Sequence, residues 1–182
     1  MPALVFGVAV GNVLKGVPFR LDDNLRSWWE GGLLDLFTPS TLLAGLLSVA
    51  MLVLHGAGWL SLKIEQGPVL ARARRFGLWA GALSLLLFAL GGLMVAMGDM
   101  GVRLADGVDP NGPSNPLMHP AVAAPGAWLD NYAAAPWTLI APILGFAGPL
   151  LAMLGIARRW DVGVFLGSSL GVIGIISTVG LS

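Results

Sequence analysis

The chain contains two histidines and no cysteine, and only one of the histidines lies in an apolar segment. His55 occurs in the stretch LVLHGAGW, about eight residues before Lys63, hence roughly 12 Å from the end of that segment if it is helical. An imidazole there could ligate haem iron, relay protons or form a hydrogen bond with a quinone. The alternative is a neutral imidazole hydrogen-bonded to a neighbouring helix. His119 lies in a turn-rich loop, where a solvated side chain is expected.

No other set of residues in the sequence has the types and spacing needed for catalysis. The four long apolar runs contain no Asp, Glu, Lys or Arg, although intramembrane charges usually mark proton and ion paths. The absence of cysteine excludes disulfides, Cys-ligated metals and thiol chemistry. Phosphate-binding glycine loops, catalytic triads and metal-ligand spacings do not occur. We therefore predict no catalytic residue and no metal site, and His55 is a weak candidate for cofactor binding.

The elements that must position His55 are membrane-spanning helices. Charged residues make up 11% of the 182 residues, whereas soluble domains contain about 25%. Four apolar runs approach the ~20 residues that a ~30 Å hydrocarbon core requires; they are residues 41–62, 77–98, 136–157 and 163–181. The predicted fold is all-α: a polytopic transmembrane helix bundle with four full spans and a partial N-terminal helix.

The partial helix comprises residues 1–13, which would rise only about 20 Å and so cannot span. Gly11 and Asn12 are expected to close this helix, and Pro18 to fix the exit of the chain from it. Because the chain also stops directly after an apolar run, we expect residues 1–182 to be a single transmembrane domain truncated at both ends.

The distribution of Lys and Arg predicts the orientation of the spans. The loop at residues 63–76 carries four basic residues against one acidic residue, and the loop at 158–161 carries two against one. The loops at 14–40 and 99–135 carry four acidic residues each, against three and one basic residues. The positive-inside rule places the first two loops in the cytoplasm and the other two outside. The chain has no basic patch suited to nucleic acid.

Several residues are expected to fix the chain at the membrane interface. The stretch Asp22–Asn24 can cap a short helix that runs through Glu30, which would place Trp28 and Trp29 at the level of the headgroups. Trp128 suits the same level in the second outer loop. The remaining predicted membrane anchors are the basic residues Arg72, Arg74 and Arg75.

Small residues at helical spacing predict close helix packing. Gly163, Gly167 and Gly171 form consecutive G-xxx-G steps, a spacing that lets helix backbones approach each other in lipid. A cofactor groove is the alternative interpretation of these glycines. Pro142 and Pro149 lie in the third long run and should kink it.

Five separated motifs resemble one known family. The motifs are GNVLKGVPF, LAGLLSVAMLVLHGAGWLSLK, SNPL, GAWLDNY and DVGVFLGSSLGVIGIISTVGLS. In this order they resemble the central part of subunit II of the cytochrome bd ubiquinol oxidases. The resemblance covers essentially all 182 residues, but only about the middle half of the family's subunit.

The resemblance implies a non-haem-bearing subunit of a complex that oxidises quinol and reduces O₂ to water in the bacterial cytoplasmic (inner) membrane. It implies that two b-type haems and one d-type haem belong to subunit I, which would be the heterodimer partner, and it allows a bound quinone and small accessory subunits. Because the carboxylates linked to proton delivery precede the matching part, no residue here inherits a catalytic role. The chain alone is expected to be inactive.

Two other functions are compatible with the composition. A secondary-transporter fragment would use a broken helix near the midplane, and the predicted kinks at Pro142 and Pro149 would supply one. A non-catalytic membrane scaffold would need only the packing faces. Quinol oxidation that depends on the chain distinguishes the oxidase subunit from both.

Overall fold

The computed structural model describes residues 1–17, 19–98, 100–105, 107, 109, 111–113 and 120–181. Its α-helices are α1 (Pro2–Lys15), α2 (Pro39–Lys63), α3 (Pro68–Met97), α4 (Asp130–Ala134), α5 (Ile140–Ala157) and α6 (Asp161–Leu181). Short 3-10 turns are η1 (Leu33–Leu36), η3 (Ala127–Leu129) and η4 (Pro136–Leu139). The strands are β1 (Phe19–Leu21), β2 (Ser27–Trp29), β3 (Val102–Leu104) and β4 (Ala121–Ala123).

Within the described residues, four helical segments are long and apolar enough to cross a membrane, which confirms the predicted helix bundle. They are α2, α3, η4 together with α5, and α6. The predicted loop at 63–76 is wrong, because α3 begins at Pro68 and only residues 64–67 separate it from α2. Proline is favourable in the first turn of a helix, and long Arg side chains can reach out of the hydrocarbon from a helix end. The three arginines of that predicted loop therefore lie on α3, and Lys63 is the last residue of α2.

The prediction that Gly11 and Asn12 close the first helix is also wrong. Helix α1 continues to Lys15 and ends where Gly16 adopts a φ of 82°, which glycine tolerates without steric cost. Asn12 is buried instead, and its Nδ2 donates to the carbonyl oxygens of Val8 at 2.8 Å and Leu36 at 2.9 Å. The bond to Leu36 ties α1 to η1. Pro18 lies outside the described residues.

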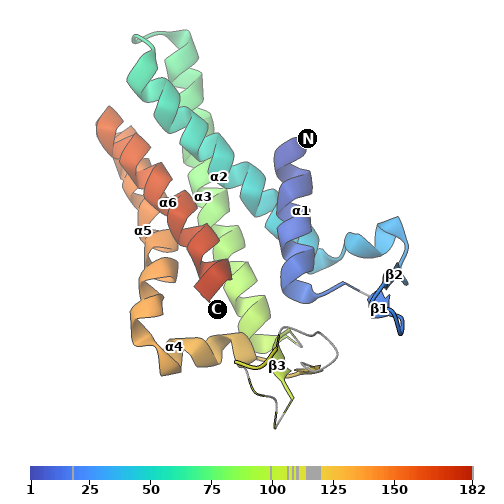
Figure 1. Ribbon diagram of the computed structural model, residues 1–182. Coiled ribbons are helices and arrows are strands. Elements are labelled where there is room, and N and C mark those ends of the chain that lie inside the picture. Colours follow the sequence, from blue (N-terminus) through green and yellow to red (C-terminus); the bar gives the residue numbers. More distant parts are fainter. Residues whose placement is uncertain are drawn as a thin grey trace.

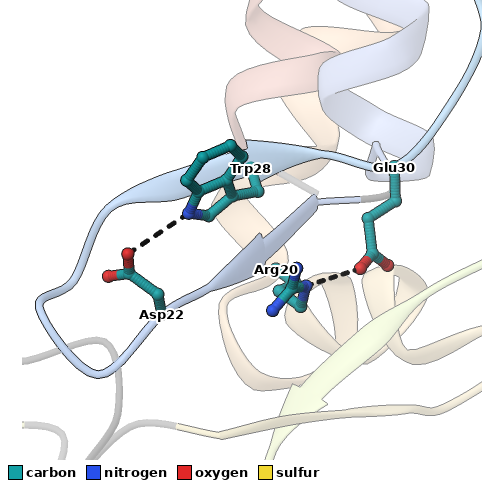
Figure 2. Close-up of polar contacts among 4 residues, drawn as sticks. All are labelled: Arg20, Asp22, Trp28 and Glu30. Atoms are coloured by element: carbon teal, nitrogen blue, oxygen red, sulfur yellow. Dashed lines mark hydrogen bonds and ion pairs between the residues drawn. The ribbon is translucent and has the colours of Figure 1, made fainter.

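A β-hairpin replaces the predicted helix that was to follow Asp22. Strands β1 and β2 pair antiparallel, and Asp22 Oδ1 accepts hydrogen bonds from the backbone N–H groups of Asn24 and Arg26 at 2.9 and 2.8 Å. The indole Nε1 of Trp28 donates to Asp22 Oδ2 at 3.2 Å (Figure 2). The bonds from Arg26 and then Trp28 are the main reasons why the pKa of Asp22 lies below its usual range. The carboxylate thus organises a turn between strands.

Exposed ion pairs lie on or next to both hairpins of the structure. Arg20 Nε is 2.9 Å from Glu30 Oε1 (Figure 2), and Arg103 of the β3–β4 hairpin pairs with Asp130. All four side chains are more than half exposed, so these pairs contribute little stability.

Helix α2 lies in the middle of the bundle, where it packs against α1, α3 and α6, and α5 packs along α6. The central core combines side chains of α2, α3, α5 and α6, namely Leu54, Ala80, Ala152, Ile156 and Val164. Both hairpins, α4 and the C-terminal end of α6 gather at one end, which we call the hairpin end; the α2–α3 and α5–α6 turns lie at the opposite end (Figure 1).

Candidate functional site

His55 on α2 reaches across to α6. Its Nδ1 atom lies 3.1 Å from Ser168 Oγ, and its ring centroid lies 5.3 Å from that of Phe165. Gly58 makes this approach possible, because a Cβ there would lie 2.9 Å from Ser168 Oγ and 3.1 Å from Phe165 Cα. Because Gly58 has no side chain, α2 and α6 lie close enough for the imidazole of His55 to reach Ser168.

The hydrogen bonds of Ser168 determine what His55 can do. Ser168 is only 2% exposed, and its hydroxyl donates to the carbonyl oxygen of Phe165 at 2.9 Å. Since a hydroxyl has one proton, the bond to the imidazole assigns Nδ1 of His55 as the donor. No group of three or more His, Cys, Asp or Glu that could hold a metal ion occurs among the described residues. His119 lies outside them. The arrangement supports a hydrogen bond between α2 and α6.

An apolar cavity of about 280 Å³ lies among the helices at the hairpin end. Phe88 and Phe146, whose ring centroids are 4.8 Å apart, line it together with Trp128 and Tyr132. Burial raises the pKa of the Tyr132 phenol, so this group stays protonated and can donate a hydrogen bond. His55 does not line the cavity.

Gly167 and Gly171 lie where α6 contacts α5 most closely. A Cβ at Gly167 would lie 2.5 Å from the backbone nitrogen of Ala152. From the other side, a Cβ at Gly148 would lie 2.2 Å from the backbone nitrogen of Gly171. The two backbones are therefore in direct contact, an arrangement that small residues permit in membrane helices.

Gly163 has a different neighbour from the other two glycines of its series. A Cβ there would lie 2.2 Å from the ring of Trp160, so Gly163 makes room for an indole of the α5–α6 turn.

Pro149 lies inside α5, and Gly171 accommodates its ring, since a Cβ at Gly171 would lie 2.8 Å from Pro149 Cδ. Pro142 is in the first turn of α5.

The predicted tryptophan anchors occupy two environments. Trp28 and Trp29 are exposed on β2 at the hairpin end. Trp128 is half-buried in η3 and lines the cavity. The ring of Trp128 therefore forms part of the cavity wall. Its contact with lipid headgroups stays a prediction.

The three arginines of α3 also differ from one another. Arg72 and Arg75 are exposed, whereas the side chain of Arg74 is 12% exposed and its Nη2 lies 2.6 Å from Asp161 Oδ1 at the start of α6. Arg74 Nη1 lies 3.3 Å from Gln66 Oε1. Arg74 thus joins the α2–α3 turn to α6.

Sequence reasoning missed Ser168, the cavity and the ion pair of Arg74 with Asp161. The hydroxyls in the G-S-S stretch of α6 were a signal that this helix could carry a polar contact. The cavity and the ion pair have no local sequence signal, because their members come from separate helices.

A model of the family described as "Cytochrome bd terminal oxidase subunit II" matches residues 1–182. A protein of Escherichia coli (strain K12) named "Cytochrome bd-I ubiquinol oxidase subunit 2" is 37% identical over 182 residues, which are 100% of this chain and 48% of the relative. A Haemophilus influenzae protein named "Probable cytochrome oxidase subunit 2" is 35% identical over 183 residues, again covering 100% of this chain and 48% of the relative. The chain spans about half the length of these curated relatives. Since the family model matches the chain from its first residue to its last, the chain belongs to the cytochrome bd terminal oxidase subunit II family.

Proposed function

We propose that this chain is the central part of the non-haem-bearing membrane subunit of a quinol oxidase, which oxidises quinol and reduces O₂ to water together with a haem-bearing subunit I. The observation that carries the proposal is the family match over residues 1–182. The name of the Escherichia coli relative, a ubiquinol oxidase subunit, supports quinol as the electron donor. The parts of the relatives that this chain does not match supply the rest of the proposed subunit.

The contribution of this chain to the oxidase is structural. Its α5–α6 contact is made backbone to backbone, and His55 uses its Nδ1 to hold α2 against α6. The cavity offers haem iron no imidazole, because His55, the one histidine in the spans, does not line it. We assign the two b-type haems and the d-type haem to subunit I. Small accessory membrane subunits would pack against the same complex.

The cavity at the hairpin end fits a bound quinone better than it fits haem. Quinones carry two electrons and two protons when they are reduced. The apolar walls formed by side chains such as Phe88 and Phe146 suit an isoprenoid chain, and the protonated Tyr132 can donate a hydrogen bond to a carbonyl oxygen. These residues would bind and orient the ring without taking part in electron transfer.

We assign the end with the α2–α3 and α5–α6 turns to the cytoplasm and the hairpin end to the periplasm. The charges support this orientation, because residues 63–76 and 158–161 carry six basic residues against two acidic ones. A cysteine introduced at Gln66 should be labelled by a membrane-impermeant thiol reagent only after the cells are opened. A cysteine at Asn24 should be labelled in intact spheroplasts.

Deletion of the full-length parent gene tests the proposed function. Membranes of the deletion strain should lose quinol oxidase activity and the absorption bands of the haem complex, and the intact gene should restore both. A haem complex that forms and oxidises quinol normally without this subunit would contradict the proposal. Retained haem bands with lost activity would support it, because the subunit would then be needed for function and not for haem insertion.

A further inference from the structure

Basic side chains gather at the end of the bundle opposite to the hairpins. This basic end consists of the α2–α3 turn, the first two turns of α3 and the α5–α6 turn (Figure 1). Its basic residues are Lys63, Arg72, Arg74, Arg75, Arg158 and Arg159, and its acidic residues are Glu65 and Asp161. The net charge of this end is therefore +4.

Most of these cations have no acidic partner in the part of the chain that the structure describes. The salt bridge of this end joins Arg74 to Asp161 and so uses one cation and one anion. Lys63 Nζ lies 5.0 Å from the ring centroid of Trp59. Arg158 and Arg159 are exposed on the α5–α6 turn. They are available to an anion from outside the chain.

Arg159 occupies a backbone position that normally belongs to glycine. Helix α5 ends in a Schellman cap, in which Trp160 N donates to Gly155 O at 2.8 Å and Arg159 N donates to Ile156 O at 3.3 Å. Arg159 has a φ of 55°, in the left-handed region where a Cβ is unfavourable. Glycine would adopt this backbone conformation with less strain than arginine. What arginine contributes at this position is therefore its positive charge.

The indole next to Arg159 marks the level of the lipid headgroups. Trp160 is 49% exposed, and the absence of a side chain at Gly163 lets its ring lie against α6. Indoles prefer the boundary between hydrocarbon and water. A guanidinium beside such a ring lies at the depth of the lipid phosphates, which its positive charge attracts.

We infer that the α5–α6 turn binds the headgroup of an anionic phospholipid, with Arg158 and Arg159 as the phosphate ligands and Trp160 against the glycerol region. The exposed arginines of α3 add to the field that attracts the lipid. Binding of a lipid at this turn requires only that the chain lies in a membrane. It is thus independent of the proposed oxidase activity.

Arg159→Gly and Arg159→Lys separate the role of the charge from the stability of the fold. Glycine relieves the left-handed backbone and removes the cation, whereas lysine preserves the cation and the backbone strain. Arg26→Gln, at the hairpin end, is the control for a general loss of positive charge. Each variant of the full-length subunit, purified in its complex, is titrated with phosphatidylglycerol or phosphatidylcholine, and bound lipid is counted by native mass spectrometry.

Arg159→Gly should bind phosphatidylglycerol roughly fivefold more weakly, as expected for the loss of one cation near a membrane surface. Its binding of phosphatidylcholine and its thermal stability should not fall. Arg159→Lys and Arg26→Gln should bind both lipids within about twofold of the wild type. Added salt should weaken the binding of phosphatidylglycerol alone.

Three results would overturn the inference. One is an Arg159→Gly variant that retains its affinity for phosphatidylglycerol. Another is wild-type complex that binds the two lipids equally, as it would if a protein partner covered the turn or if the arginines only set the topology. The third is displacement of the lipid by orthophosphate at similar concentration, which would indicate a site for free anions.

Discussion

Replacement of Gly148 by alanine should destabilise the bundle, although the substitution adds only one methyl group. The new Cβ would lie 2.2 Å from the backbone nitrogen and 2.5 Å from the Cα of Gly171, and 2.7 Å from the carbonyl oxygen of Gly167. Ordinary contacts begin near 3.4 Å, so α6 would have to move by about 1.2 Å. All three contacted atoms belong to the backbone of α6, and no side-chain rotation can relieve the contact.

The size of the effect follows from two opposing contributions. Overpacking of a well-packed interior costs about 1–3 kcal/mol, and we expect the upper part of that range because the obstacle is a backbone. Alanine also favours a helix over glycine by up to about 1 kcal/mol. The expected net loss of stability for Gly148→Ala is therefore about 1–2 kcal/mol.

Gly56→Ala is the matched control, because a Cβ at Gly56 would have nothing within 4 Å. It gains the same helix propensity without a steric cost and should be neutral or slightly stabilising. The difference between the two variants isolates the steric contribution, about 2–3 kcal/mol. It can be measured on the full-length subunit by unfolding in mixed micelles with increasing SDS, followed by far-UV circular dichroism. Equal stability of the two variants would refute the claim that the α5–α6 backbones are in contact.

Three further predictions concern polar contacts. Arg74→Gln should cost about 1–2 kcal/mol, between the values for exposed and buried pairs, because its ion pair with α6 is partly buried; an additive double-mutant cycle with Asp161→Asn would show that the pair contributes nothing. Ser168→Ala should cost about 0.5–1 kcal/mol and shift the ¹⁵N NMR signals of the His55 ring, and unchanged signals would contradict the assigned bond. The lowered pKa of Asp22 means that the carboxylate stabilises the hairpin above its ordinary pKa and that this contribution is lost as the pH falls through the lower folded-state pKa. Tryptophan fluorescence should therefore change on acidification below about pH 4, and the change should be absent from Asp22→Asn.

The helices of the bundle were predictable from hydropathy, but their ends were not. The cluster of arginines between Arg72 and Arg75 indicated a loop because charges are costly in hydrocarbon, although a helix can extend past the hydrocarbon while long side chains reach the water. The dipeptide Gly67-Pro68 was the better signal, since proline favours the first turn. Hydropathy indicates which residues lie in the hydrocarbon core, whereas capping residues indicate where the helix begins and ends.

Asp22 shows why the hairpin was mistaken for a helix. An aspartate that caps a helix accepts hydrogen bonds from N–H groups shortly after it, and Asp22 does the same for Asn24 and Arg26 within a turn. The local signal is common to both structures. Pairing between β1 and β2 decides the outcome, and that pairing is not visible in the stretch around Asp22.

The candidate site was predictable only in part. His55 stood out because it is the one titratable side chain in an apolar run. Its partner Ser168 is 113 residues away, and nothing in one sequence connects the two positions. The cavity is built from residues of α1, the four spans and the segment around Trp128, so it exists only after the helices pack.

In the orientation proposed above, the segments assigned to the two sides of the membrane carry opposite charges, which couples the orientation of the chain to the voltage across the membrane. Residues 63–76 and 158–161 have a net charge of +4, and residues 14–40 and 99–135 have a net charge of −4. Inverting the chain from the proposed orientation, against an inside-negative potential of about 100 mV, would cost about 18 kcal/mol, because each elementary charge contributes about 2.3 kcal/mol and the two sets move in opposite directions. In an energised membrane, the electric field therefore acts as a restoring force on the orientation established during insertion.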